Sequence, residues 1–227
     1  MRARKHGRLK RSAMTLVELI LVVFVIAVLA ALLLPMNPRR SNPPKIVRAK
    51  VEIASLATAI EAYEFEYQHL PLADLTTNED DTCGISSASI TDFKKVDGTR
   101  LSARNSDLMI VPMDYDLGVN AGHKLNAHMV VDTNSPGVSA VDHQYRDPWG
   151  NPLVISLDAN SDGFVRDAIY ASAALYANSL ATPLTNHNGV YELSGKVMVW
   201  SRGPDGKTSI SVNANSGVNK DNVMSWQ

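Results

Sequence analysis

The sequence predicts an α+β protein, in which a long N-terminal helix, membrane-embedded over its first half, packs on a small antiparallel β-sheet. An unbroken apolar run extends from Met14 to Leu34. Apolar residues then recur at helical spacing between residues 46 and 63. A β-rich segment, LVISL at 153–157, follows a turn motif in the C-terminal part. These three observations divide the chain into a membrane helix over residues 14–35, an amphipathic helix and a sheet.

Composition favours one ordinary globular domain with additional segments. The chain has 227 residues, 20% of them charged, and a net charge of -1, which argues against nucleic-acid binding. Its single cysteine, Cys83, excludes a disulfide within the chain, and we interpret it as a plain small residue. The first eleven residues are basic without any acid, through Arg2, Arg4, Lys5, Arg8, Lys10 and Arg11.

The apolar run from Met14 to Leu34 is long enough to span roughly 30 Å as a helix, at about 1.5 Å per residue. Its apolar side chains together outweigh the one carboxylate, Glu18, which costs about 3 kcal/mol. The basic residues before the run predict a cytoplasmic N-terminus and place everything after Pro35 outside. A cleavable secretory signal and a plain anchor with an incidental glutamate are the alternatives.

At its N-terminal end this run carries a family resemblance. A basic leader, Ala13 and then MTLVEL at 14–19 resemble the processing signal of type IV pilins and type II secretion pseudopilins. The resemblance implies that prepilin peptidase removes residues 1–13 by cutting between Ala13 and Met14, and that Met14 is then N-methylated. Glu18 becomes the fifth residue, and Pro35 lies where many members have a helix-kinking proline. The family usually has glycine and phenylalanine at the cut, where this chain has Ala13 and Met14.

Glu18 is the most informative residue of the run. A carboxylate in lipid is costly unless it is paired. The resemblance implies that it meets the new N-terminal amine of Met14 in a neighbouring subunit and so sets the axial register of a filament. The alternative is that Glu18 interacts only with the N-terminus of its own helix.

The second half of the helix is expected over residues 36–71. Pro38, Pro43 and Pro44 predict a kinked or locally melted entry. The helix is then expected to end at Pro71, in a tyrosine- and proline-containing stretch that resembles the major pseudopilin. Its apolar stripe, which needs a sheet to cover it, comprises Ile46, Ile53, Leu56, Ile60 and Tyr63.

Residues 72–143 are predicted as a variable region of loops and short strands. The polar stretch TTNEDDTCGISSASITD at 76–92 is typical of an exposed loop. DLMIVPM at 107–113 and AHMVVD at 127–132 are candidate strands. The spacing of His123, His128 and His143 does not suggest a metal site.

Residues 144–227 are expected to form the β-sheet head. DPWGNP at 147–152 has turn chemistry and leads into the strand LVISL. Together with VMVWSRGPDGK at 197–207 and GVNKDNVMSW at 217–226, this motif resembles the sheet region of major pseudopilins.

Two segments are candidate calcium sites. Asp158, Asn160 and Asp162, followed by Gly163, match the first half of a calcium loop. The twelfth position is Ile169 and not an acid, and Asp167 is the nearby carboxylate, so Asx-turns on a hairpin are an equal alternative.

The second candidate is implied by the resemblance, since major pseudopilins hold a structural calcium ion in the C-terminal loop. Asp205 matches an acidic ligand position, and Asp221 is the obvious carboxylate at the other end. Alignment on the closing Ser-Trp instead places Lys220 and Asn222 at the acidic positions.

The predicted function is that of a structural subunit that polymerises into a periplasmic pseudopilus for type II protein secretion. Partners implied by the resemblance are further copies of the chain, prepilin peptidase, minor pseudopilins and an inner-membrane assembly platform. We expect a single-pass inner-membrane protein with a cytoplasmic N-terminus and a periplasmic head. No nucleotide-binding or hydrolase motif is found, so an enzyme is not expected. The alternatives are a surface type IV pilin and an uncleaved, membrane-tethered periplasmic binding or calcium module.

Overall fold

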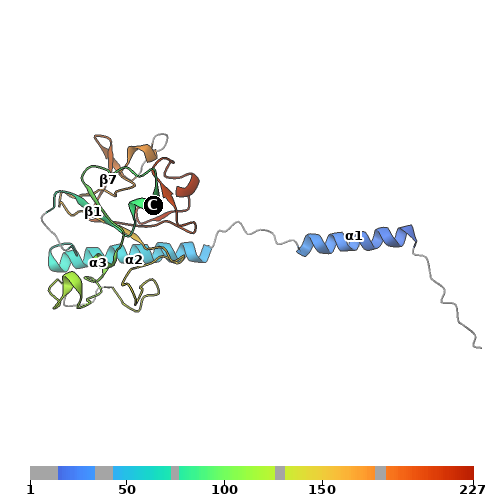
Figure 1. The fold of residues 1–227 in the computed structure, drawn as a ribbon, viewed down its shortest axis with the longest axis horizontal. Coiled ribbons are helices and arrows are strands. Elements are labelled where there is room, and N and C mark those ends of the chain that lie inside the picture. The colour runs from blue at the N-terminus through green and yellow to red at the C-terminus, as the bar shows by residue number, and fades with distance from the viewer. Residues whose placement is uncertain (1–14, 34–42, 73–76, 126–130, 177–182) are drawn as a thin grey trace, which may run out of the picture. The chain divides into compact units, whose positions relative to one another are not determined.

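The computed structural model describes residues 15–33, 43–72, 77–125, 131–176 and 183–227 (Figure 1). It divides into two compact units, Met1–Ser41 and Asn42–Gln227. The first unit contains helix α1 (Leu16–Leu33). Thr15 starts this helix, because its side-chain Oγ1 accepts the backbone N–H of Glu18 at 3.3 Å and its carbonyl accepts that of Leu19 at 3.1 Å.

The second unit begins with helix α2 (Pro43–Tyr67). A proline at the first helical position costs little, since that N–H would have no partner within the helix. The helix ends at Tyr67, before the predicted Pro71, because Gln68 has a left-handed backbone with φ 58°. The predicted stripe is confirmed at Ile53, Leu56, Ile60 and Tyr63, which are buried, while Ile46 is half-buried.

A five-stranded sheet lies against α2, with the order β10-β8-β4-β1-β3. Helix α2 contacts β8 and β10, the two C-terminal strands of this sheet. The strands are β1 (Asp80–Cys83), β3 (Thr99–Ser102), β4 (Val154–Leu157), β8 (Val197–Ser201) and β10 (Val223–Met224). The strand predicted at 153–157 is therefore confirmed as β4.

The sheet is mixed, which corrects the expectation of a purely antiparallel one. The pairs β1–β4, β4–β8 and β8–β10 are antiparallel, whereas β1 and β3 are parallel. A parallel pair needs a crossover connection, and residues 84–98 supply it.

Strand β1 corrects the prediction of an exposed loop at 76–92. It lies inside the sheet between β3 and β4, and Asp80, Thr82 and Cys83 are buried. Its polar side chains are compatible with burial because they are bonded. Arg166 donates its backbone N–H to Asp80 Oδ2 at 2.7 Å, and the hydroxyls of Thr82 and Ser156 lie 2.9 Å apart.

The prediction of a strand at 107–113 is also wrong. Its first residues belong to the short helix α3 (Ser106–Met109), and turns follow. Leu108, Met109 and Val111 bury their side chains there, and a short apolar run does not distinguish helix from strand. Of the candidate strand at 127–132, residues 127–130 lie outside the described residues.

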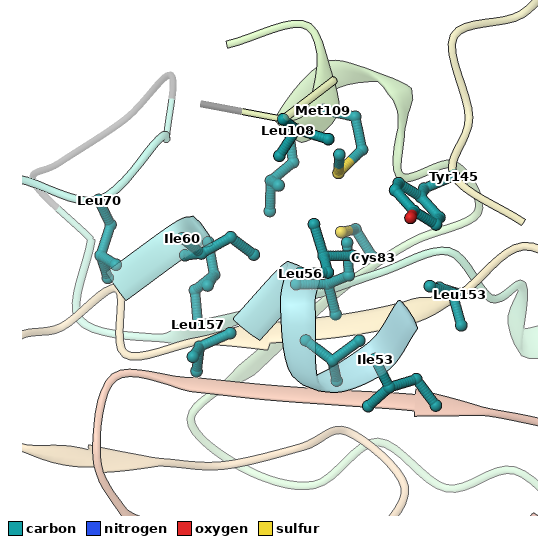
Figure 2. Close-up of a cluster of buried hydrophobic side chains, with 14 of the residues drawn as sticks. Ile53, Leu56, Ile60, Leu70, Cys83, Leu108, Met109, Tyr145, Leu153 and Leu157 are labelled. Atoms are coloured by element: carbon teal, nitrogen blue, oxygen red, sulfur yellow. The ribbon is translucent and has the colours of Figure 1, made fainter. Parts of the chain in front are cut away.

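The sheet is buried on both faces. Alternating residues of β4 separate two cores, with Ile155 and Leu157 on the α2 side and Val154 on the other. Figure 2 shows the α2-side cluster, in which Ile53, Leu56 and Ile60 of α2 meet side chains of the sheet and of the α3 segment. The second core surrounds Trp200 and Tyr170, which are both fully buried.

Two smaller sheets complete the second unit. The parallel pair comprises β2 (Ile90–Thr91) and β9 (Thr208–Ser209). The three-stranded antiparallel sheet has the order β5-β7-β6, from Phe164–Val165, Val190–Ser194 and Thr185–His187. Short 3-10 helices cover Ser87–Ser89, Gly118–Asn120, Ala173–Tyr176 and Gly217–Asn219.

Candidate functional site

The first candidate site is the N-terminal turn of α1. Thr15 and Glu18 have the spacing of a capping box, and the backbone half of that motif is formed, with Glu18 N–H bonded to Thr15 Oγ1. Within the described residues, the Glu18 carboxylate has no hydrogen-bond or ion-pair partner. Ala13, Met14 and Pro35, on which the processing and kink predictions fall, lie outside the described residues.

The surface of α1 is apolar around its whole circumference. From Leu16 to Leu29 every side chain is exposed within the first unit, and Glu18 is the single charge in the helix. Among the residues that the structure describes, no helix combines the length and apolar character needed to cross a membrane. The predicted span starts at Met14 and ends at Leu34, which are both outside those residues.

The second candidate site is the loop that contains Asp158, Asn160 and Asp162. The buried Asp158 carboxylate accepts the backbone N–H groups of Asp162 and Gly163, each at 3.0 Å. Lys196 Nζ lies 3.1 Å from Asp158 Oδ2 and neutralises it. Asn160 Oδ1 accepts the N–H of Asp162 at 3.0 Å, so the loop has the bonding of Asx-turns.

Asp80 lies close to this loop, although the sequence separates them widely. Burial raises the pKa of Asp80 to about 7, and the negative charges of Asp158 and Asp162 add to the increase. The N–H donated by Arg166 opposes it. In the described structure Asp80 Oδ1 is buried without a hydrogen-bond partner, so a neutral carboxyl group fits this position better than a carboxylate.

The third candidate site is formed by the GPDG turn and the C-terminal segment, which the structure brings together. A Cβ on Gly203, whose φ is 64°, would lie 2.2 Å from the carbonyl oxygen of Asp221, so the two segments are in direct contact. Burial, and then the negative charge of Asp205, raise the pKa of Asp221. The two predicted carboxylates, Asp205 and Asp221, are therefore close enough for the charge of Asp205 to act on Asp221.

Two buried acceptors in this segment are without partners in the described structure, Asp221 Oδ1 and Asn222 Oδ1. The amide nitrogen of Asn222 donates to the hydroxyl of Tyr170 at 2.7 Å, which fixes the side chain. Unpartnered oxygens beside a second carboxylate suit a hard cation. Across the described residues, however, no group of three or more His, Cys, Asp or Glu side chains is placed to hold a metal ion. Carbonyl and amide oxygens would have to complete the shell.

The DPWGNP turn supports this third site. Asp147 Oδ2 accepts the hydroxyl of Ser201 at 2.6 Å, and Ser201 Oγ accepts the N–H of Gly203 at 2.9 Å. Asn151 Nδ2 donates to the carbonyl of Gly203 at 3.0 Å. The two motifs that resemble pseudopilins, at 147–152 and 197–207, are thus bonded to each other.

Sequence reasoning missed the buried carboxyl groups of Asp80 and Glu192. Asp80 lies in the polar stretch at 76–92, whose composition predicts an exposed loop. Glu192 pairs with Arg166 and, at 2.6 Å, with His187. The alternating pattern of VYELS at 190–194 was the only signal for that strand.

Comparison with known proteins gives one partial similarity. The chain is 34% identical, over 59 residues, to the type II secretion system core protein G of Pseudomonas aeruginosa. The match covers 26% of this chain and 42% of that protein, so it supports a pseudopilin-like relationship over that stretch alone. No family model matches the chain. No solved structure matches it either.

Proposed function

We propose that the chain is a pilin-like subunit of a type II secretion pseudopilus. The observation that carries the proposal is an apolar helix, α1, with a single carboxylate, Glu18, in its first turn. A helix that is apolar on every side needs lipid or other helices around it. The Glu18 carboxylate, which has no partner among the described residues, needs a positive charge, and a free amine at Met14 would supply one.

The head is consistent with this role. Helix α2 packs on a sheet, as expected for the soluble half of a pilin-like N-terminal helix. The partial similarity to the core protein G adds independent support. In this proposal prepilin peptidase cuts after Ala13, residues 14–35 stay in the inner membrane, and the head is periplasmic. Copies of the chain then polymerise on an assembly platform with minor pseudopilins.

Calcium belongs to the proposal as a structural ion of the third site. Asp205 and Asp221 would supply the carboxylates, and the amide oxygen of Asn222 is the further candidate. Their mutual repulsion and the unpartnered oxygens of Asp221 and Asn222 support a cation here. The loop at Asp158 supports one less well, because Lys196 already neutralises that carboxylate.

The first test is intact mass and N-terminal sequencing of the protein from membranes of its native host. A chain that starts at Met14, with an added methyl group, is the expected result. A chain that still carries residues 1–13 contradicts the proposal and favours the uncleaved, tethered module.

The second test changes Glu18→Gln, which keeps the shape of the side chain and removes its charge. Processing should continue while sedimentable filaments are lost, because the register-setting pair cannot form. The matched control is Asp97→Asn, an exposed carboxylate outside both helices that should leave filaments unchanged. Filaments on the cell surface instead of within the periplasm would identify the surface pilin alternative.

A further inference from the structure

The outer face of α2 carries an apolar stripe that the head does not cover. At about 100° per residue, this stripe lies directly opposite the buried one. Val47 is 61% exposed, Val51 59% and Phe65 80%. The stripe comprises Val47, Val51, Ala54, Thr58, Ala62 and Phe65, all exposed. Spacings of three and four residues, sustained along the helix, are those of a helix–helix seam.

The stripe has small residues at its middle and larger ones at its two ends. Small side chains, Ala54 and Thr58, lie at the centre, and larger ones, Val47 and Phe65, lie at the two ends. Reading the helix backwards therefore pairs Ala54 with Thr58 and Val47 with Phe65. Val51 then lies nearly opposite Ala62, which sets a larger side chain against a smaller one. A second copy in the opposite direction therefore brings the small centres of the two stripes together.

Charges beside the stripe have the matching arrangement. One flank has Lys50 near the beginning of α2 and Glu61 near its end, and the other flank has Arg48 and Glu66. In an antiparallel helix pair the same flanks of the two helices meet, so base faces acid on both sides. Lys50 and Glu61 are exposed, and the part of the chain that the structure describes offers neither an ion-pair partner. Arg48, on the other flank, already pairs with Glu52 of its own helix at 2.7 Å. A parallel pair in register would instead bring the basic ends together and the acidic ends together.

We infer that the outer face of α2 binds the same face of a second copy of this chain in the antiparallel direction. The twofold axis crosses the stripe midway between Ala54 and Thr58, at the level of Leu56 along the helix. The partner is identified by the charge complementarity of Lys50 with Glu61 and by the small side chains at the centre of the stripe. Such an interface is self-complementary and closes on itself, so it gives a dimer and does not propagate. It goes beyond the proposed filament, whose subunits all point one way, and describes subunits that have not polymerised.

Single cysteines along the stripe test the orientation, using the full-length chain in membranes of its native host and a short bismaleimide. Cys83, the native cysteine, is buried and serves as background. At about 1.5 Å per residue, like residues at position 54 or 58 lie roughly 6 Å apart along the axis, and at 47 or 65 roughly 27 Å. Dimers are therefore expected from Ala54→Cys and Thr58→Cys, and not from Val47→Cys or Phe65→Cys.

The outcomes separate the alternatives. Dimers from all four variants would show a parallel pair and overturn the inference, as would the absence of dimers from all four. Products larger than dimers would show an open assembly and also overturn it. Filament formation by the unmodified chain is scored separately, so this inference and the proposed function can fail independently.

A measurement on the unmodified chain protects against effects of the substitutions. Carbodiimide joins a lysine to a carboxylate without a spacer, and mass spectrometry then identifies the linked peptides. Within one helix Lys50 and Glu61 are separated by about 16 Å, which is too far for this bond. A Lys50–Glu61 cross-link is thus expected only between copies, and its absence contradicts the inference.

Charge reversal gives the matched control. Lys50→Glu or Glu61→Lys alone should lower the dimer fraction, with an association constant about fivefold weaker, equivalent to about 1 kcal/mol. The double exchange should restore it, because the attraction is re-formed with opposite signs. Lys94→Glu, at an exposed lysine outside α2, should change nothing. Equal losses in the single and double variants would overturn the pairing.

Discussion

The indole Nε1 of Trp200 donates a 2.8 Å hydrogen bond to Asp167 Oδ2, inside the second core. The same oxygen accepts the hydroxyl of Ser156 at 2.6 Å. The other carboxylate oxygen accepts the backbone N–H groups of Ile169 and Tyr170, each at 2.8 Å. Four donors therefore satisfy a buried carboxylate that has no cationic partner among the described residues, and they join β4 and β8 to the segment that follows β5.

Replacement of Asp167 by alanine should be among the most destabilising single changes. It leaves four buried donors without an acceptor, and we expect a loss of roughly 3–5 kcal/mol in the free energy of unfolding. Urea unfolding, followed by tryptophan fluorescence, measures the loss. Asp97→Ala removes an exposed carboxylate and should stay within about 0.5 kcal/mol of the parent. Similar stabilities for the two variants would contradict this account of the core.

Asp80 should make the head less stable as the pH rises. In the unfolded chain its carboxyl group titrates near 3.8, whereas burial raises the folded pKa to about 7. Between these values the unfolded state loses its proton first, so the free energy of unfolding falls with increasing pH and levels off above pH 7. The total contribution is on the order of 2–4 kcal/mol.

Asp80→Asn tests that pH dependence, because the amide has the shape of the neutral carboxyl group and still accepts the N–H of Arg166. The variant should be more stable than the parent at pH 8 and about equal to it at pH 4. Thermal unfolding across this range provides the measurement. Parallel curves for parent and variant would show that Asp80 is ionised in the folded head.

Calcium should stabilise the head through the third site. At about a hundred times its Kd, a bound ion adds about 2.7 kcal/mol, which raises Tm by roughly 5–10 °C. Asp221→Asn should abolish this increase, whereas Asp158→Asn should retain it and thereby separate the two candidate loops. Magnesium provides the comparison ion. An equal response to calcium in the parent and in Asp221→Asn would rule out the third site.

The parts of the fold that were predicted correctly are those with a regular apolar pattern. Helix α2 follows from the spacing of Ile53, Leu56 and Ile60, and β4 from its apolar run after a turn. The contact between the GPDG turn and Asp221 was predicted only by family resemblance, since the separation in sequence contains no information on proximity.

Strand β1 and the parallel β1–β3 pair could not be predicted in this way. Asp80 and Asp81 have low strand propensity, and β1 is held by partners such as Arg166 that are distant in sequence. Helix α3 was missed because its short apolar run also fits a strand. Tertiary contacts decide both elements.

Helix α2 is the first element of the second unit to be synthesised, yet it is covered by β8 and β10, which lie near the end of the chain. The apolar face of α2 can therefore be buried only after almost the whole head has been synthesised. Closure between such distant segments is entropically costly and slow. During that interval the nascent head exposes Ile53, Leu56 and Ile60, and this apolar surface makes the incomplete head prone to aggregation.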